Sequence, residues 1–415
     1  MRITALTFGT EGDWRPMAAL CHGIAAAGHD VQMLGPDSCA PLAARLGVRF
    51  VALEGDMAAE LAAAMPSVER GAGPAEIGRI IRGFAQRHTT GWMRTVLDAA
   101  RGADVILPAG LAVYVGLSVA EHLRVPVVGI GLQPVMPTGD FPSAFLPAWR
   151  MPRWANRLSH RLVLALMWRA FRGATNAARR DVAGQPRRRA EWRGYPILFG
   201  ISPTLMPRPR DWPERYEVTG HWSTPGDPAW RPDPALDAFL AAGAPPIYVG
   251  FGSMLGFDRA KAERAVLEGL AGRRALIASG AVGLGDGTLP PNALRIGATP
   301  HDWLFPRVHV VVHHGGAGTT HAAARAGVPS VVVPFGGDQA FWAARAHKLG
   351  IAAAPLAHRA LSGPALQARL DYASTAHVQQ WAREIGEAVR AEDGIATAVA
   401  ALERIVVPSP VARAA

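Results

Sequence analysis

Short apolar, β-branched runs alternate with alanine-rich helical runs along both halves of the chain. In the N-terminal half this pattern predicts helices over Pro16–Ala27 and Val115–His122, and strands over Ile3–Phe8, Asp30–Leu34, Asp104–Leu107 and Val127–Ile130. In the C-terminal half it predicts strands over Ile247–Phe251, Ala275–Ala278, Val308–Val312 and Ser330–Val333. Strands that alternate with helices of roughly 10 to 15 residues are typical of parallel sheets with right-handed crossovers. We therefore expect an α/β fold with two doubly wound halves.

A proline-rich stretch separates the two halves. Eight prolines fall between Pro203 and Pro234, and such a segment is stiff and irregular, as in a linker between domains. The stretch from roughly Pro364 to Val406 is rich in alanine and arginine and is predicted to be helical. We place an N-terminal domain at residues 1–215, a C-terminal domain at 216–390 and a C-terminal helix or tail at 391–415. Doubly wound sheets bind ligands beyond the carboxyl ends of their strands, so a ligand is expected between the domains.

The composition excludes several classes of protein. The chain has 415 residues, of which 49% are hydrophobic and 18% charged, so it can bury a large core without extensive disorder. Its two cysteines, Cys21 and Cys39, are too few for a disulfide framework or a four-cysteine zinc site, and they fit a reducing compartment. The longest apolar run, Val105–Ala120, is interrupted by a proline and two glycines, whereas a membrane span needs roughly 20 apolar residues. Since no secretory signal is visible either, we expect a cytoplasmic protein.

Positive charge is concentrated in one segment. Between Arg150 and Arg193 there are 12 arginines and two acids, Asp181 and Glu191, and the excess of +10 equals the formal net charge of the whole chain. A nucleic-acid binder would more often spread this charge over a recognition face, so we expect no nucleic-acid partner. On a helical wheel one stripe holds Arg157, Arg161, Arg169 and Arg172, and elsewhere lie Leu158, Leu162, Val163 and Leu166. Two interpretations are open: peripheral contact with anionic membranes, and a solvated arginine face that covers the N-terminal domain.

A strand with two histidines and a glycine-rich turn gives the strongest local signal. Val310 to Thr320 reads Val-Val-Val-His-His-Gly-Gly-Ala-Gly-Thr-Thr, and an alanine-rich helix follows. Glycines let backbone N–H groups approach a ligand closely, and a helix N-terminus offers free donors and the positive end of a dipole. This chemistry suits a phosphate or a diphosphate. The segment lacks the lysine of a P-loop and the spacing of a dinucleotide fingerprint. The alternative is an ordinary tight turn with two polar histidines.

Two carboxylates follow predicted strands. Asp338 and Gln339 lie after the strand Ser330–Val333 and offer acceptors and donors for the vicinal hydroxyls of a sugar, unless Asp338 merely caps a helix. Asp13 lies between the first strand and the first helix, where a carboxylate suits a general base. The alternative for Asp13 is the cap of a helix that begins near Pro16.

These stretches, in this order, resemble the family-1 nucleotide-sugar glycosyltransferases of the GT-B fold. The resemblance covers most of the chain and points in particular to the branch that contains sterol glucosyltransferases and glycopeptide-antibiotic glycosyltransferases. It is carried by Gly9-Thr10-Glu11-Gly12-Asp13-Trp14-Arg15-Pro16, by Tyr248-Val249-Gly250-Phe251-Gly252-Ser253-Met254, and above all by Thr299 to Gly350, including Pro300-His301-Asp302-Trp303-Leu304-Phe305. It implies two Rossmann-like domains that face a central cleft, with the C-terminal helix returning to the N-terminal domain.

Position by position, the resemblance implies a role for each motif. Asp13 corresponds to the catalytic base. The diphosphate site corresponds to Ser253, His314, Gly316, Gly318 and Thr319, and the pair that holds the donor sugar corresponds to Asp338 and Gln339. Two positions depart from the family pattern: Ala298 replaces the tryptophan that stacks on the base in plant enzymes, and Glu11 replaces a basic residue. We therefore assign nucleoside binding to His301 or Trp303.

The implied reaction is single-displacement transfer of a hexose, with inversion, from a UDP- or dTDP-sugar to a hydroxyl of a hydrophobic acceptor such as a sterol, another lipid or a polyketide-like product. The expected sugar is glucose, and the nucleotide-sugar is a co-substrate rather than a cofactor. No Asp-x-Asp sequence occurs, so we expect no metal site. The acceptor is expected to meet the loops Glu54–Thr90 and Gln133–Trp149. Other functions remain open: a nucleotide-sugar epimerase or cell-wall precursor transferase of the same fold, and a non-catalytic lipid-binding protein.

Overall fold

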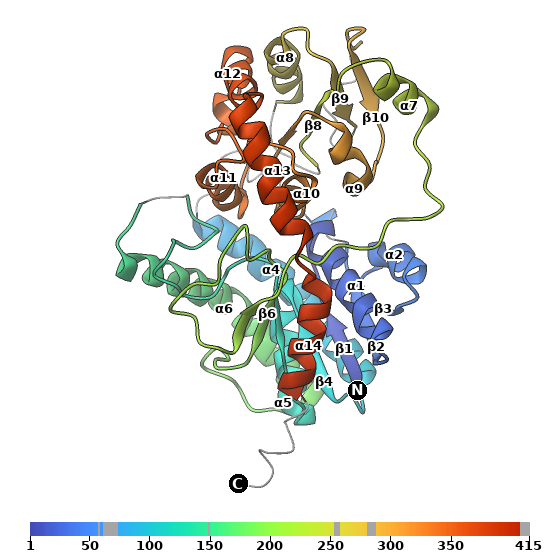
Figure 1. Cartoon of the computed structure of the whole chain (residues 1–415). Helices are drawn as coiled ribbons and strands as arrows, with labels where there is room; N and C mark the ends of the chain where they lie inside the picture. The colour runs from blue at the N-terminus through green and yellow to red at the C-terminus, as the bar shows by residue number, and fades with distance from the viewer. Residues whose placement is uncertain (57–58, 61–73, 148–149, 253–257, 280–287, 407–415) are drawn as a thin grey trace.

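The computed structural model describes residues 1–56, 59–60, 74–147, 150–252, 258–279 and 288–406. Two α/β domains lie one above the other in Figure 1, and each is built on a parallel sheet. This confirms the predicted fold class. None of the helices in the described ranges combines the length and the apolar character that crossing a membrane requires.

The N-terminal sheet has the strand order β3-β2-β1-β4, and a parallel bridge between Ile106 and Val127 joins it to β5-β6-β7. Successive side chains of a strand point to opposite faces, so Ile3 lies in one apolar cluster and Leu6 in another. The first cluster is covered by α1, α2 and α14, and the second by α4, α5 and α6. The elements are β1 (Arg2–Leu6), α1 (Glu11–Ala26), β2 (Asp30–Pro36), α2 (Ala40–Arg45), β3 (Arg49–Leu53), α4 (Pro74–Ala99), β4 (Val105–Pro108), α5 (Val113–Leu123), β5 (Gly129–Gly131), α6 (Arg153–Ala183), β6 (Ile197–Phe199), β7 (Tyr216–Val218) and α14 (Gly394–Val406).

The C-terminal sheet has the strand order β10-β9-β8-β11-β12, with all neighbours parallel. One face packs against α8 and α12, and the other against α7, α9 and α10. The elements are α7 (Pro234–Ala241), β8 (Ile247–Gly250), α8 (Arg259–Leu270), β9 (Ala275–Ala278), β10 (Ala293–Ile296), α9 (His301–Leu304), β11 (Val310–His313), α10 (Ala317–Ala326), β12 (Ser330–Val332), α11 (Gln339–Lys348), α12 (Gly363–Ala373) and α13 (Ala376–Arg390). Strands that are buried on both faces read as continuous apolar runs, as Val310–Val312 does.

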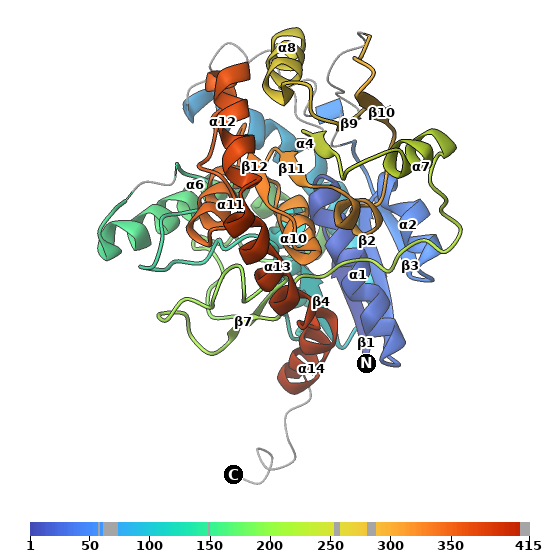
Figure 2. The ribbon, with the colours of Figure 1, turned by 45° about the horizontal axis from the view of Figure 1, so that its top comes forward.

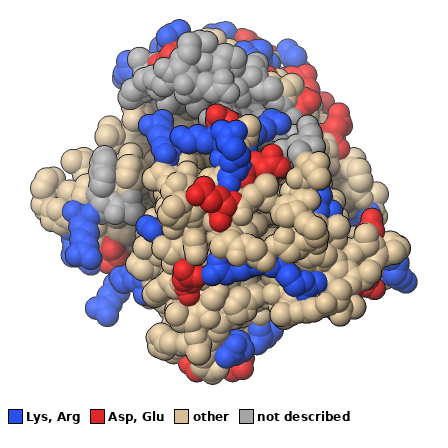
Figure 3. All heavy atoms as spheres, turned by 90° about the horizontal axis from the view of Figure 1, so that it is seen from above, with Lys and Arg blue, Asp and Glu red and all other residues tan. Residues whose placement is uncertain are grey.

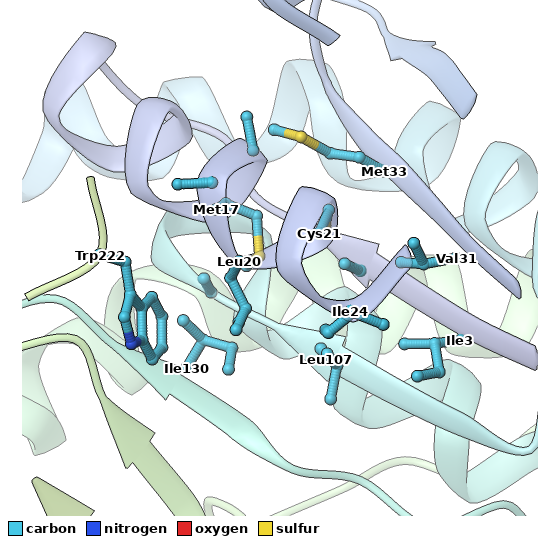
Figure 4. Packing of buried hydrophobic residues seen from close by; sticks show 14 of the residues in the cluster. Ile3, Met17, Leu20, Cys21, Ile24, Val31, Met33, Leu107, Ile130 and Trp222 are labelled. Carbon is cyan, nitrogen blue, oxygen red and sulfur yellow. The ribbon is translucent and has the colours of Figure 1, made fainter. Parts of the chain in front are cut away.

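The end of the chain returns to the N-terminal domain. In Figure 2, α13 runs along α10, and α14 then turns down beside α1. Trp222 of the linker is fully buried at this junction, where its Nε1 donates to Gly394 O at 3.1 Å. Figure 4 shows Trp222 beside Leu20 of α1 and Ile130, within the cluster that α14 covers. The linker and α14 therefore tie the two domains together.

Three predicted boundaries differ from the structure. Strand β7 pairs in parallel with β6, so the N-terminal domain continues to Val218 and does not end at residue 215. The predicted loop Glu54–Thr90 is helical from Pro74 onward, because this part belongs to α4. Residues 61–73 of the same loop lie outside the described residues. Helix α1 starts at Glu11, five residues before Pro16, and ends just before Gly28, which has a φ of +85°.

Candidate active site

Asp13 lies in the first turn of α1, close to the carboxyl end of β1. The backbone N–H and the hydroxyl of Thr10 both donate to Asp13 Oδ2, at 2.8 and 3.2 Å. Gly9 leaves room for this carboxylate, because a Cβ there would overlap Asp13 Oδ2. Burial raises the pKa of Asp13 above its ordinary value, while hydrogen bonds from Thr10 and the Gln133 side chain oppose the rise. The turn therefore fixes a carboxylate that is more basic than an exposed aspartate.

Asp13 also contributes to capping, although not in the way the sequence suggests. Thr10 occupies the N-cap position of α1, and Asp13 is the third residue of the helix. The bond from the Thr10 N–H to Asp13 satisfies a backbone donor at the helix start, as in a capping box. Both Thr10 bonds reach the same oxygen, so capping and a role in chemistry are compatible.

The turn after β11 has the shape of an anion site. Gly315 has a φ of +90°, which glycine adopts without strain, and α10 begins at Ala317 with Gly316 at its N-cap. The first N–H groups of a helix have no acceptor within it and lie at the positive end of its dipole. Gly318 and Thr319 fall in this first turn. The glycines and the threonine assigned to the diphosphate are therefore together at one helix N-terminus.

His314 lies against this turn between two glycines. A Cβ at Gly316 would overlap its Nε2, and a Cβ at Gly252 would lie 3.2 Å from its Cε1. Burial lowers the pKa of His314 to about 4, with a contribution from His301, so the imidazole is neutral at pH 7. Its Nδ1 is buried and has no hydrogen-bond partner within the described ranges. A buried nitrogen without a partner, next to free backbone donors, fits an oxygen of a bound ligand.

Asp338 and Gln339 follow β12. Trp342 Nε1 donates to Asp338 Oδ2 at 2.8 Å, and Asp338 makes no side-chain hydrogen bond to the start of α11 although it occupies the N-cap position. The helix-capping alternative for Asp338 is therefore wrong. Gln339 Oε1 accepts from the backbone N–H groups of Phe335 and Gly336, at 2.7 and 3.1 Å. Gln339 thus shapes the loop that presents Asp338.

Groups of the two domains meet between the facing ends of the sheets. Burial raises the pKa of Asp338 to about 6, and the Asp13 carboxylate of the other domain adds to the rise. Burial likewise lowers the pKa of His301 to about 4, and Arg15 of α1 contributes. His301 in turn contributes to the lowered pKa of His314. The two domains also touch beside Asp338, where the rings of Phe141 and Phe341 have centroids 5.0 Å apart. We therefore treat Asp13, Asp338, His301 and His314 as parts of one candidate site.

The two residues assigned to the nucleoside lie in different surroundings. His301 is part of the group just described, whereas Trp303 packs against Trp230 of the linker, with ring centroids 5.0 Å apart, and Arg307 lies over its ring at 4.3 Å. A role for Trp303 in nucleoside binding stays a prediction. Ser253, assigned to the diphosphate, lies outside the described residues.

The sequence analysis missed two side chains that hold the carboxylates. Trp342 follows Asp338 by four residues, which places both on one helix face, so the spacing contained a usable signal. Gln133, whose side chain opposes the rise in the pKa of Asp13, comes from a distant segment after β5, and nothing in its local sequence marks it.

Replacing Asp338 with asparagine is expected to raise the unfolding temperature clearly at pH 8 and far less near pH 4. The folded-state pKa of about 6 lies above the ordinary 3.8, so ionisation of Asp338 costs stability as the pH rises through this range. Asparagine carries no charge and still accepts the Trp342 bond. Thermal unfolding of both proteins at the two pH values checks this. An equal shift at both values would show that the charge of Asp338 is not the cause.

Comparisons with known proteins agree with this geometry. Residues 280–388 match the profile of the erythromycin biosynthesis protein CIII-like C-terminal domain. The chain is 34% identical to O-mycaminosyltylonolide 6-deoxyallosyltransferase of Streptomyces fradiae, over 97% of both chains. It is 31% identical to the sterol 3-beta-glucosyltransferase of Aspergillus clavatus, over 97% of this chain and 30% of that protein. The chain thus spans less than a third of the length of this sterol enzyme.

Solved structures share the fold at lower identity. The glycosyltransferase of kitacinnamycin has a TM-score of 0.72 at 20% identity, over 97% of this chain and 98% of that one. The glycosyltransferase VinC, solved with dTDP, has a TM-score of 0.66 at 19% identity, over 99% of this chain and 100% of that one. These likenesses concern the fold, whereas the Streptomyces fradiae enzyme is related in sequence over its whole length. The chain therefore belongs to the family-1 nucleotide-sugar glycosyltransferases of the GT-B fold, enzymes that transfer sugars.

Proposed function

We propose that the protein transfers a hexose, with glucose as the first candidate, from a UDP- or dTDP-sugar to a hydroxyl of a hydrophobic acceptor. In this proposal the anomeric carbon is inverted and neither a metal ion nor a cofactor is needed. The observation that carries the proposal is the fixed Asp13 carboxylate, whose Oδ2 accepts from the Thr10 N–H and hydroxyl at 2.8 and 3.2 Å, together with the buried His314 at the glycine turn that begins α10. It supports a site in which a fixed carboxylate of one domain faces the donor-binding residues of the other.

The donor fits the C-terminal side of this site. Its diphosphate would lie at the N-terminus of α10, against His314 and the N–H groups of Gly318 and Thr319. The ionised carboxylate of Asp338 would accept hydrogen bonds from the sugar hydroxyls, and Gln339 would support the loop. His301 would lie toward the nucleoside.

The reaction then needs one base and one stabilised leaving group. Asp13 takes the proton of the acceptor hydroxyl while the hydroxyl oxygen bonds to the anomeric carbon from the face opposite the diphosphate. The bond from the anomeric carbon to the diphosphate oxygen breaks, and its electron pair stays on the nucleoside diphosphate. Negative charge grows there and is met by the helix N–H groups, the dipole and His314. Attack from the opposite face inverts the anomeric configuration.

The names of the relatives support the choice of sugar and acceptor. One names a deoxyallosyl transfer and a tylonolide derivative, and others name glucosyl transfer to a sterol. Both point to a hexose and to an acceptor with a large apolar skeleton, which fits the proposal. The complex of VinC with dTDP supports the inclusion of thymidine donors.

A panel of nucleotide-sugars tests the proposal. A matching UDP- or dTDP-hexose at about 100 times its Kd should stabilise the protein by roughly 2.7 kcal/mol in thermal unfolding. With that donor and an apolar alcohol, proton NMR should show a product whose anomeric configuration is opposite to that of the donor, also in the presence of EDTA. If no nucleotide-sugar stabilises the protein, or if the configuration is retained, the proposal is wrong.

A further inference from the structure

Helix α6 exposes a row of apolar side chains. Four of them follow one another at four-residue spacing and are 68, 56, 55 and 55% exposed: Trp154, Leu158, Leu162 and Leu166. The sequence analysis expected the leucines to lie away from the arginine stripe, yet Arg161 and Arg169 are exposed beside them. The opposite side of the helix is buried through Trp168 and Phe171. An exposed apolar row with polar neighbours marks an interaction surface.

The second half of α6 borders an open hollow of about 600 Å³ that is rich in arginine. Its lining contains five guanidinium groups and no carboxylate, and they belong to Arg82 of α4, to Arg169, Arg172 and Arg180 of α6, and to Arg187. Arg180 pairs with Asp181. For the other four, the described part of the chain provides no hydrogen bond and no ion pair.

Several other arginines of this region have structural partners within the described residues. Arg157 pairs with Asp211 at 2.7 Å, and Arg179 pairs with Glu121 at 3.0 Å. These ion pairs hold α6 to the rest of the N-terminal domain. Four of the five arginines that line the hollow are available to meet a partner, and so are exposed arginines outside it such as Arg161.

The apolar row and the hollow share one side of α6. An ideal helix turns by about 100° per residue, so the row and the three lining arginines of α6 fall within a sector of about 120°. The apolar part comes first along the helix and the cationic part second. In Figures 1 and 2 the first turns of α6 lie at the outer side of the N-terminal domain. The face seen from above in Figure 3 carries both signs of charge close together, unlike the lining of the hollow.

We propose that this side of α6 docks on an anionic lipid bilayer. The apolar row would enter the boundary of the acyl chains, and the hollow would receive lipid phosphates, as in an interfacial amphipathic helix. Nucleic acid offers no site for a row of leucines, and a second copy of the chain would bring like charges together. The inference does not depend on the chemistry of the active site. If the acceptor is hydrophobic as proposed, docking brings the enzyme to the membrane in which such an acceptor dissolves.

Flotation of the full chain with vesicles tests this. At low salt the protein should float with phosphatidylcholine vesicles that contain phosphatidylglycerol and should stay at the bottom with pure phosphatidylcholine. Arg169→Gln/Arg172→Gln should lower the partition coefficient on anionic vesicles by about 30-fold, from about 1 kcal/mol for each arginine. Trp154→Gln/Leu158→Gln/Leu162→Gln should reduce recovery to the level found with neutral vesicles.

Matched controls separate docking from general charge effects and from catalysis. Arg259→Gln/Arg264→Gln removes two exposed arginines of α8 and should float like the wild type. All variants should transfer sugar to a water-soluble alcohol at the wild-type rate when no vesicles are present, so flotation can fail while the proposed chemistry stands. Equal recovery on neutral and anionic vesicles overturns the proposal. Flotation of the α6 variants at the wild-type level also overturns it. The same holds if the wild type self-associates and Trp154→Gln/Leu158→Gln/Leu162→Gln does not.

Discussion

Asp13→Asn is expected to lower the turnover number by about 10²- to 10⁴-fold, because an amide cannot accept the proton of the acceptor hydroxyl and general-base catalysis contributes a factor of this size. The substitution keeps the size of the side chain and an oxygen that accepts from the Thr10 N–H. Asparagine and aspartate cap helices about equally well, and burial raises the pKa of Asp13, so the unfolding temperature at pH 7 should not fall and should rise if the loss of charge dominates. Initial rates and thermal unfolding on both proteins check these two expectations together.

A second variant tests whether the position of the Asp13 carboxylate matters for turnover, in addition to its presence. Gly9→Ala keeps Asp13 but adds a methyl group that overlaps its Oδ2, so the carboxylate must move. We expect a large loss of turnover here too, since misplacement of a reacting group by about 1 Å can cost 10²-fold. Near-wild-type turnover of Gly9→Ala would show that the fixed position of Asp13 in this turn does not matter for the reaction.

His314→Ala is expected to slow transfer by about 10²- to 10³-fold and to weaken donor binding as well. The imidazole lies at the N-terminus of α10, and its Nδ1 has no hydrogen-bond partner among the described residues, so it would stabilise the charge that grows on the diphosphate. Removal of one such donor costs a factor of this size. Donor affinity by calorimetry and single-turnover rates measure both effects.

Gly316→Ala is the companion to this variant. The added Cβ would overlap His314 Nε2, so the imidazole should be displaced but not removed. Like His314→Ala, Gly316→Ala should therefore bind the donor more weakly than the wild type. His122→Ala removes an exposed histidine of α5 and serves as the control that should behave like the wild type. If His314→Ala retains full donor affinity, the diphosphate does not bind at this turn.

The fold was predictable because the strands of both sheets carry their own signal. The apolar run Val310–Val312 favours a strand that is buried on both faces, as in a parallel sheet, and the alanine-rich stretch after the glycine turn favours a helix. The candidate site was proposed from the family motifs at Asp13 and Asp338, which are local in sequence, and their roles stay predictions.

Long-range features were not predictable from local pattern. Strand β7 owes its place to pairing with β6 rather than to its own residues, so the predicted domain boundary fell short of it. Helix α4 begins at Pro74, inside the stretch that we expected to be a loop. The exposure of Leu158 and Leu162 depends on what packs against the other side of α6, which a helical wheel does not contain.

Thr10 fixes Asp13 in the N-terminal domain, whereas His314 and the glycine turn belong to the C-terminal domain, so in the proposed reaction acceptor activation and donor binding are separable functions of the two domains. The most direct test is a paired measurement, donor Kd and single-turnover rate at saturating donor, on the wild type, Asp13→Asn and His314→Ala. The account predicts that Asp13→Asn slows the single turnover by at least about 10²-fold while donor Kd stays within about twofold, and that His314→Ala changes both. Weakened donor binding in Asp13→Asn, with a single-turnover rate equal to that of the wild type, would contradict it and would leave Asp13 as a donor ligand rather than the base.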